Sequence, residues 1–261
     1  MKEYREGMSF KYTSLKRDGH FTELRIQDGT TRVFTRGGIE ITQKVLWAPW
    51  FHAAAAASRK DPAPRTFYGE MWLPGGDASS VKTAYCNRNV MVRFDVFGAG
   101  HLPTGCPLVD VRHDAWHCGL EMIPWADTTE KRVAMWPEMM GTPDVEGFVY
   151  SDGNMLNQHK WKPMRTCELI ITGIKKGSGI LAGTVGAIQV STFEGEEMAS
   201  VSAGLTYQER AALDHEPEWY IGKVVEIQYQ GIGAGGRLRH PVFKYFRPDK
   251  PAAECTAEQF S

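Results

Sequence analysis

The stretch that decides the fold is Lys16-Arg17-Asp18-Gly19, which is followed by two short runs of alternating apolar and polar residues. The first run covers residues 22–27 (TELRIQ), Asp28-Gly29 supplies a turn, and the second run covers residues 31–35 (TRVFT). Alternation with a period of two is typical of a half-buried strand, and an Asp-Gly pair between two such runs favours a hairpin. The pattern therefore predicts a lysine before a turn, followed by a strand–turn–strand unit.

The next 120 residues continue this mixture of strands and helices. Strands are expected at 66–73, 90–97 and 146–150, a helix at 50–60 that ends before Pro62 and Pro64, and mixed helix and loop at 101–145. The composition changes after Pro163, where short strands separated by glycines are expected at 167–174, 184–190, 223–229 and 241–246. Thr206 and Glu209 fit the capping box of a single helix between them, at about 206–214. Short strands with one helix are typical of an OB-fold, a small β-barrel.

Composition is ordinary for a soluble globular protein, with 42% hydrophobic and 23% charged residues among 261, and the formal net charge is −1. That balance does not by itself indicate a nucleic-acid binder. Two local tracts, 160–176 and 237–250, are nevertheless basic, which suits binding of phosphates along one surface. A pair of solvated surface faces explains the same charges equally well.

The sequence also limits the compartment and the metal chemistry. No apolar stretch reaches the ~18 residues that span a bilayer, and the N-terminus has no signal-peptide pattern, so a cytoplasmic protein is expected. The five cysteines form no CxxC pair, which argues against a disulfide framework and a zinc ribbon. His113 and His117 lie four apart, but no H-E-x-x-H pattern accompanies them, so a structural zinc site is not favoured.

Lys16 is the candidate nucleophile. An amine attacks phosphorus only when deprotonated, and the ordinary lysine pKa of about 10.4 must be lowered by burial or by nearby cations. Read alone, the motif favours a surface lysine before a turn. The residues that follow favour the nucleophile, because several further motifs appear in a fixed order: Thr35-Arg36-Gly37-Gly38, Tyr68-Gly69-Glu70-Met71, Phe94-Asp95-Val96-Phe97, Glu146-Gly147-Phe148-Val149, Lys160-Trp161-Lys162-Pro163 and Phe246-Arg247-Pro248-Asp249-Lys250.

This order of motifs resembles the ATP-dependent DNA ligases, most closely the small phage-type enzymes of the covalent nucleotidyltransferase superfamily. The resemblance covers about residues 10–250 and implies an α+β fold. An adenylation domain of antiparallel, ATP-grasp-like sheets with helices would span residues 1–164, and an OB-fold β-barrel would span residues 165–261. It also implies an enzyme of DNA replication or repair that seals nicks through a lysyl-AMP intermediate.

The resemblance assigns roles to individual residues. The nucleotide is expected to contact Lys16, Asp18, Arg36, Glu70, Phe94, Glu146, Lys160, Lys162, Arg247 and Lys250. Glu146 and Glu70 are the expected ligands of Mg²⁺ or Mn²⁺, and Phe94 is expected to stack on adenine. Nucleic-acid contacts are expected from Arg36, Lys175, Lys176, Arg237 and Arg239. A buried salt bridge at Glu70, a core position for Phe94 and a charged strand end at 246–250 are the structural alternatives.

The chain departs from the family pattern at three of these motifs. Phe21 occupies the place of the arginine in K-x-D-G-x-R, which in the family grips nick phosphate. Tyr68 replaces the leading aspartate of D-G-E, and Ser151 replaces the lysine that usually closes the motif beginning at Glu146. Phe21 puts one phosphate contact in doubt and leaves room for a changed strand preference at the nick.

The expected cofactors are ATP, bound covalently as AMP, and Mg²⁺ or Mn²⁺, and the expected partner is a nicked duplex bound by a monomer, with no membrane. NAD-dependent relatives carry an NMN-binding domain and zinc-binding cysteines, so ATP is favoured. Lys16 lies too near the start of this sequence for a preceding DNA-binding domain, so modest, salt-sensitive duplex affinity is expected. The alternatives are an RNA- or hybrid-specific ligase, a capping-like guanylyltransferase, and a non-catalytic OB-fold nucleic-acid binder.

Overall fold

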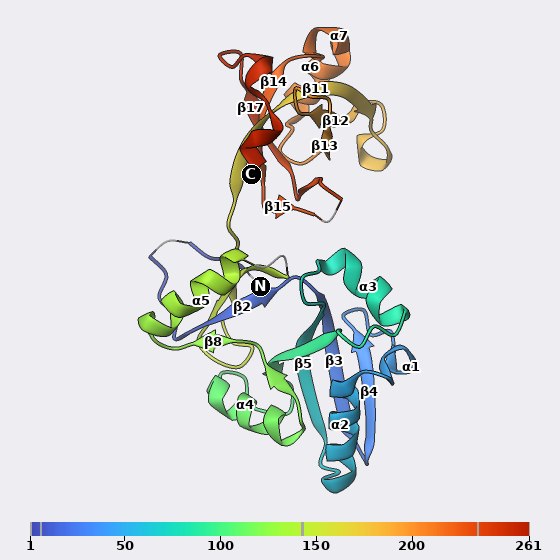
Figure 1. Cartoon of the computed structure of the whole chain (residues 1–261), viewed down its shortest axis with the longest axis vertical. Coiled ribbons are helices and arrows are strands. Elements are labelled where there is room, and N and C mark those ends of the chain that lie inside the picture. The colour runs from blue at the N-terminus through green and yellow to red at the C-terminus, as the bar shows by residue number, and fades with distance from the viewer. Residues whose placement is uncertain (1, 6, 142–143, 234, 261) are drawn as a thin grey trace. The chain divides into compact units, whose positions relative to one another are not determined.

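The computed structural model describes residues 2–5, 7–141, 144–233 and 235–260, and the chain divides into two compact units (Figure 1). The first unit is Met1–Lys162 and the second is Pro163–Ser261. The boundary between them therefore falls two residues before the predicted one. None of the described helices is long and apolar enough to cross a membrane.

The first unit contains two five-stranded sheets. We call one the Lys16 sheet; its strands in spatial order are β1 (Lys2–Glu3), β10 (His159–Trp161), β9 (Val145–Ser151), β2 (Tyr12–Arg17) and β8 (Trp125–Ala126). We call the other the helix-backed sheet; its order is β4 (Thr30–Thr35), β3 (His20–Gln27), β5 (Arg65–Trp72), β6 (Arg93–Ala99) and β7 (Glu121–Met122). Strands pair antiparallel except at β1–β10 and β6–β7.

Within the described part of this unit, five helices accompany the sheets: α1 (Thr42–Val45), α2 (Pro49–Lys60), α3 (Ala78–Cys86), α4 (Leu108–His117) and α5 (Thr129–Gly141). Helix α2 begins with a proline at its first turn, where the missing N–H costs nothing, and it packs on β3 and β4. Its buried residues Trp50, Phe51, Ala54 and Ser58 form one helical stripe. Helix α4 packs on β6 and β7, whereas α5 packs on β8 and β9.

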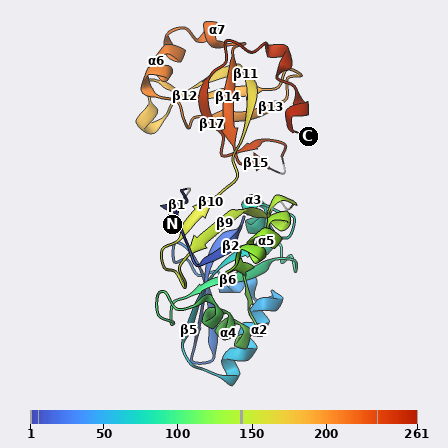
Figure 2. The ribbon, with the colours of Figure 1, turned by 90° about the vertical axis from the view of Figure 1, so that its left-hand side faces the viewer.

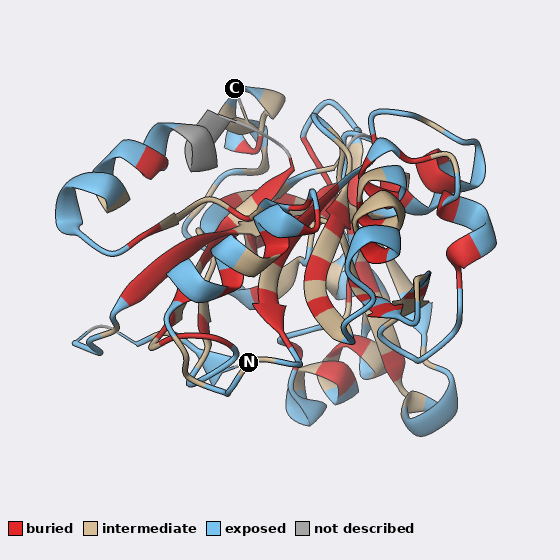
Figure 3. Ribbon diagram, turned by 90° about the horizontal axis from the view of Figure 1, so that it is seen from below, coloured by how far each residue is buried: buried red, intermediate tan, exposed pale blue. Residues whose placement is uncertain are grey.

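Alternate residues of the helix-backed sheet point to opposite faces, as the period of a strand requires. One set, which includes Leu24, Phe67 and Val96, is buried in the core beneath the helices. The banding of buried and intermediate residues along these strands is visible in Figure 3. The other set faces the Lys16 sheet, and it supplies the side chains of the site described below.

The second unit is a closed barrel with helices on one side (Figure 2). Its main sheet runs in the order β13 (Glu197–Val201), β12 (Val185–Ser191), β11 (Arg165–Lys176), β14 (Val224–Tyr229) and β17 (Val242–Phe246). A bridge between Ala203 and Val242 joins the two edges of this sheet and closes the barrel. Closure pairs backbone groups that an open edge would leave exposed.

The remaining elements of this unit are a hairpin of β15 (Gly231–Ile232) and β16 (Leu238–Arg239), the helices α6 (Tyr207–His215) and α7 (Pro217–Tyr220), and the short 3-10 turns η1 (Gly179–Leu181), η2 (Ala252–Glu254) and η3 (Ala257–Phe260). The capping box at Thr206 and Glu209 is confirmed at the start of α6. Arg210 of that helix is buried and donates hydrogen bonds to the carbonyl oxygens of Val185, Gly186 and Ser202. This guanidinium fastens α6 to the barrel.

Candidate active site

Lys16 lies near the end of β2, where two strands place acid and base side chains against each other. Its Nζ atom is 2.6 Å from Oε2 of Glu146 on β9, and Nζ of Lys162 is 2.8 Å from the same oxygen. One carboxylate therefore holds two amines. Burial opposes its charge, but the positive charge of Lys16 and hydrogen bonds with Asp18, Lys16 and Lys162 outweigh burial and lower the pKa of Glu146 to about 2.

Gly147, the residue after Glu146, must be a glycine because β9 passes close to both β2 and β10. Gly147 pairs with Lys16 across the β2–β9 ladder, and a Cβ atom added to it would lie 2.2 Å from the carbonyl oxygen of Trp161. Its φ of 150° also lies outside the range that side chains prefer. The Glu-Gly pair thus lets β9 carry a carboxylate to Lys16 while the backbone passes close to β10.

The Asp18-Gly19 pair holds the segment after Lys16 against β5. The Asp18 side chain is fully buried, and the backbone N–H of Asp18 donates to the carbonyl oxygen of Asp144 at 2.7 Å. A Cβ atom on Gly19 would lie 2.3 Å from the carbonyl oxygen of Met71 and 2.9 Å from Cγ of Glu70. The Asp-Gly step is therefore needed for this close approach, which brings Lys16 to Glu70.

Glu70 lies on the face of β5 that is turned toward the Lys16 sheet. Burial is the main cause that raises the pKa of Glu70 to about 7, and the neighbouring carboxylates of Glu146 and Asp18 raise it further against the attraction of Lys16 and Arg36. A carboxyl group with such a value titrates near neutrality and is costly to hold charged without a partner. A cation delivered by a ligand would relieve that cost.

These residues line a cavity of about 660 Å³ between the two sheets of the first unit. Its wall includes Lys16, Arg36, Glu70, Glu146, Lys160 and Lys162. Lys160 and Lys162 line the same cavity, as their spacing predicts, but they bind different partners, because Nζ of Lys160 is 2.9 Å from Oε1 of Glu3 on β1. Five cations, with Arg17 the fifth, and the half-buried carboxylates of Glu70 and Glu146 around one cavity suit a polyphosphate with its counter-cation.

The prediction that Phe94 stacks on a nucleotide base is wrong, because Phe94 lies on the face of β6 that packs into the core. Phe94 is 2% exposed and packs in the core beneath the helices, with its ring centroid 5.1 Å from that of Trp50. Phe97 lies three residues on, faces the opposite way and lines the 660 Å³ cavity. Phe97 is therefore the ring of this motif that a bound base can reach.

Arg17 is a functional candidate that the sequence did not reveal. Its side chain is 7% exposed, with Nε 3.1 Å from Oδ2 of Asp95 and Nη1 2.9 Å from Oδ2 of Asp144. The guanidinium also lies 3.9 Å from the ring centroid of Trp72. Burial raises the pKa of Asp95 to about 6, against a hydrogen bond from Trp72 and the charge of Arg17. This network ties the residue after Lys16 to β6 and to the residue that precedes β9.

The comparisons with known proteins agree with this architecture. Residues 176–247 match the DNA ligase OB-like domain family, and a search of curated proteins found no relative. The chain is similar to a solved structure of a Lig E DNA ligase, described as binding DNA with a minimal scaffold. The two are 18% identical with a TM-score of 0.66, and the match covers 94% of this chain and 97% of that one. The chain has the two-domain fold of a minimal DNA ligase.

Two further solved structures are similar to the chain to different extents. The structure named Pmar-Lig_PreS3 is 18% identical with a TM-score of 0.70, and the match covers 92% of this chain but only 64% of that one. The chain therefore spans less than two thirds of that longer protein. A mycobacterial DNA ligase D complexed with ATP and MES is 20% identical with a TM-score of 0.45, over 94% of this chain and 91% of that one.

The predicted cations of the second unit lie on the barrel of this ligase fold. Arg247 binds Oε1 of Glu168 at 2.7 Å and Oδ2 of Asp249 at 2.8 Å, and Nζ of Lys250 is 3.4 Å from Oε2 of Glu254. Hydrogen bonding to Asp249 is the main cause that raises the pKa of Arg247. The proposed nucleic-acid contacts Lys175, Lys176, Arg237 and Arg239 lie at the end of β11 and on or beside β16. Arg237 binds Glu197, and Lys176 binds Asp214.

The carboxylates of the ligase fold also bear on the expected divalent metal. Among the described residues, no group of three or more His, Cys, Asp or Glu side chains is arranged to hold a metal ion. Glu146 and Glu70 nevertheless line one cavity, and Mg²⁺ is commonly bound through one or two carboxylates, with phosphates and water completing its shell. The residues therefore fit a Mg²⁺ or Mn²⁺ ion that arrives with a nucleotide, and such an ion would neutralise phosphate charge there.

Proposed function

We propose that this chain is an ATP-dependent DNA ligase that seals nicks between a 5′-phosphate and a 3′-hydroxyl through a lysyl-AMP intermediate. The observation that carries the proposal is the Lys16–Glu146–Lys162 arrangement inside a cavity that also holds Arg36 and Glu70. A lysine amine beside convergent cations and carboxylates is the arrangement that nucleotidyl transfer needs.

Three transfers account for the reaction. The Nζ atom of Lys16 attacks the α-phosphorus of ATP, a nitrogen–phosphorus bond forms, and the bond to pyrophosphate breaks. The 5′-phosphate of the nick then attacks the same phosphorus, so AMP leaves Lys16 and joins the strand end. Finally, the 3′-hydroxyl attacks the activated 5′-phosphorus, the phosphodiester forms, and AMP leaves.

The residues around Lys16 divide this work between them. Glu146 orients the amine before ATP arrives and must release it for attack, while Lys162 receives phosphate oxygens of ATP and Arg36 meets the 5′-phosphate of the nick. Phe97 supplies an aromatic surface for adenine. In the second unit, Arg247 and Lys250 would orient the departing pyrophosphate. Positioning and electrostatic stabilisation carry most of the rate enhancement in such a site.

Labelling with radioactive nucleotide tests the first transfer. The chain is incubated with Mg²⁺ and ATP or GTP labelled at the α-phosphate, and protein label that survives alkali but is released by acid, as expected of a phosphoramidate, is measured. Label from ATP alone supports the ligase and excludes a capping-like guanylyltransferase. Lys16→Ala should abolish label and sealing while duplex binding persists, and Lys11→Ala, at an exposed lysine outside the cavity, is the matched control. Unchanged label in Lys16→Ala would mean that the chain is a non-catalytic binder or reacts elsewhere.

An RNA- or hybrid-specific ligase is the second candidate, and Phe21 is the observation that favours it. An aromatic ring stands where the resemblance expects a cation at the nick. Sealing is compared on nicked duplexes that carry DNA or RNA on each side of the break. Preference for ribonucleotides at either end would replace DNA with RNA or hybrid as the substrate.

A further inference from the structure

The two aromatic departures from the family pattern lie in contact with each other. The rings of Phe21 on β3 and Tyr68 on β5 are stacked, with centroids 6.1 Å apart and planes inclined by 27°. The ring of Phe97 lies 6.0 Å from Phe21 on another side. An arginine and an aspartate are expected at positions 21 and 68, so an aromatic pair occupies the place of a charged pair. Such an exchange need not destabilise the fold, because well-packed apolar residues of similar volume can replace an ion pair at no cost in stability.

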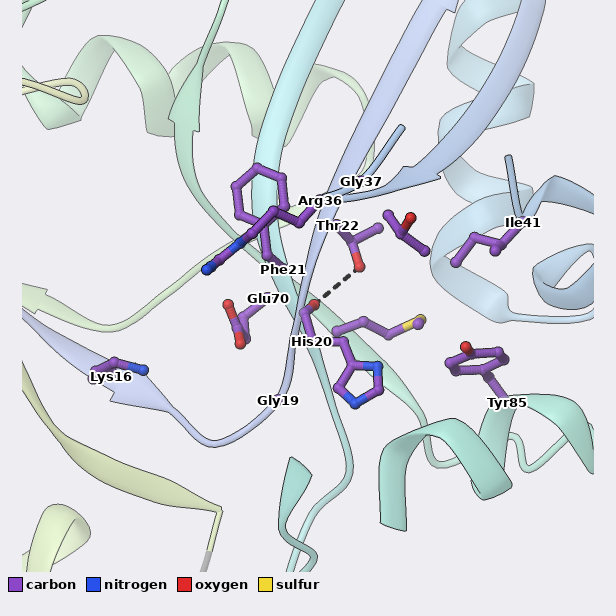
Figure 4. Close-up of a pocket in the computed structure, with 12 residues that line it drawn as sticks. Lys16, Gly19, His20, Phe21, Thr22, Arg36, Gly37, Ile41, Glu70 and Tyr85 are labelled. Carbon is purple, nitrogen blue, oxygen red and sulfur yellow. Dashed lines mark hydrogen bonds between the residues drawn. The ribbon is translucent and has the colours of Figure 1, made fainter. Parts of the chain in front are cut away.

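The third neighbour of Phe21 is a cation. The guanidinium of Arg36 lies over the Phe21 ring at 5.2 Å from its centroid, and Figure 4 shows the two side chains crossing. Arg36 follows the end of β4 and is exposed. Among the described residues, no carboxylate lies within ion-pair distance of this guanidinium; Glu70 attracts it from farther away, and the ring of Phe21 is in direct contact with it.

Arg36 and Phe21 stand on the wall between two cavities. The 660 Å³ cavity adjoins a second one of about 380 Å³, and the two share Lys16, Phe21, Arg36 and Glu70. The smaller cavity is otherwise lined mainly by neutral side chains, among them Thr22, Thr35 and Tyr85. The cations of Lys16 and Arg36 lie on the wall of the smaller cavity. Arg36 is therefore placed to meet an anion that approaches Lys16 through this cavity.

We propose that Phe21 is a positioning residue for Arg36, whose guanidinium it holds at this wall to receive the phosphorylated end of the nucleic-acid strand. The inference rests on the proposed ligase function. Phe21 has no polar atom for a phosphate, and its part is to present an aromatic face to a cation, which attracts a guanidinium electrostatically. The ring and the neighbouring arginine together do what a single arginine at position 21 does in the family pattern.

Leucine fills much of the same space without an aromatic face, so Phe21→Leu removes the hold on Arg36. We expect the KM for nicked duplex to rise roughly fivefold to tenfold, as loss of a partly exposed cation–π contact implies, while kcat and lysyl-AMP formation change less than about twofold. Phe21→Trp keeps the face and should retain the parental KM. Phe34→Leu is the matched control, because Arg25 lies 4.3 Å from the ring centroid of Phe34 on the same hairpin and neither residue lines the 660 Å³ or the 380 Å³ cavity.

A double-mutant cycle with Arg36→Gln decides whether Phe21 acts through Arg36. In that background, Phe21→Leu should change the KM by less than about twofold, because nothing is left to position. An equal effect in both backgrounds, or no effect of Phe21→Leu in the parent, overturns the proposal. Lysyl-AMP formation by the parent protein is read separately, so failure of the ligase function itself is distinguished by the absence of label.

Discussion

The two units arrange their charged side chains in opposite ways. In the first unit the ion pairs of Arg17 are buried and join segments far apart in the sequence, since Arg17 binds Asp144 across 127 positions. In the second unit Arg247 is 22% exposed and binds the exposed Asp249 two positions away, as well as Glu168, which lies 79 positions away. Buried pairs are expensive to break and fix a geometry before a ligand arrives, whereas exposed pairs exchange partners at little cost. The difference indicates one unit built as a rigid site and another whose cations are available to a ligand.

Removal of the buried arginine should have the largest effect on stability. Arg17→Met leaves Asp95 and Asp144 without their cation, so we expect the first unit to lose about 3–5 kcal/mol of unfolding free energy. Arg247→Met should leave the unfolding of the second unit nearly unchanged. Hydrogen exchange followed by mass spectrometry reads each unit separately. Equal losses in the two units would contradict the contrast drawn above.

The central carboxylate should matter next, and for chemistry more than for folding. Glu146→Gln takes the negative charge from between Lys16 and Lys162, and the rate of lysyl-AMP formation should fall by about 10²-fold, as for loss of one preorganised electrostatic group. Single-turnover labelling with ATP measures it. Glu23→Gln is the control, since Glu23 lines the same cavity but binds Arg25, and it should stay within about threefold of the parent.

Glu70 should give the first unit a pH-dependent stability of unusual sign. Its pKa is about 7 in the folded chain against 4.5 for the free side chain, so the folded state holds a proton that the unfolded state has lost between these values. The unfolding free energy should therefore fall as pH rises from 4.5 to 7 and stay low above that. Glu70→Gln should stabilise the chain at pH 8 by about 1–3 kcal/mol and weaken nucleotide binding.

Urea denaturation at pH 5 and pH 8 measures this difference. The comparison of parent with variant separates the contribution of Glu70 to the pH dependence from that of Asp95. The raised pKa of Asp95 also makes the unfolding free energy fall as pH rises. A variant that is no more stable than the parent at pH 8 would show that Glu70 is already paired. The rigid-site description of the first unit would then need revision.

The smallest effect is expected from an exposed cation of the second unit. Lys175→Ala removes one proposed phosphate contact, so the slope of log affinity against log salt should become less steep by about 1, with only a few-fold loss of duplex affinity. Fluorescence anisotropy of a labelled duplex at several salt concentrations gives the slope. Lys223→Ala, at an exposed lysine beside Trp219, should leave the slope unchanged.

Local signals allowed much of the fold to be predicted. The hairpin after Gly19, helix α2 and the capping box of α6 follow from periodicity, turn residues and caps that lie within a few positions of each other. The match of residues 176–247 to an OB-like family agrees with the predicted barrel. Strand β13 was not predicted, because Glu197–Val201 is short and lacks clear alternation.

The site was less predictable, because its geometry depends on which face of a strand each side chain occupies and on partners that are distant in the sequence. Strand β6 is buried on both faces and has an aromatic residue on each, so alternation does not say whether Phe94 or Phe97 meets the cavity. Arg17 gave no signal at all, because an arginine between Lys16 and Asp18 looks like a solvated side chain until Asp95 and Asp144 are placed around it.

The pairing of β1 with β10 has a practical consequence for handling the protein. The first described residues run beside the strand that carries Lys160, and Glu3 binds that lysine directly. An affinity tag fused ahead of Lys2 would start at the rim of the cavity and compete with the strand for its place. Purification tags are therefore better attached after the last residue, and preparations tagged at the two ends should be compared before any rate is assigned to the protein.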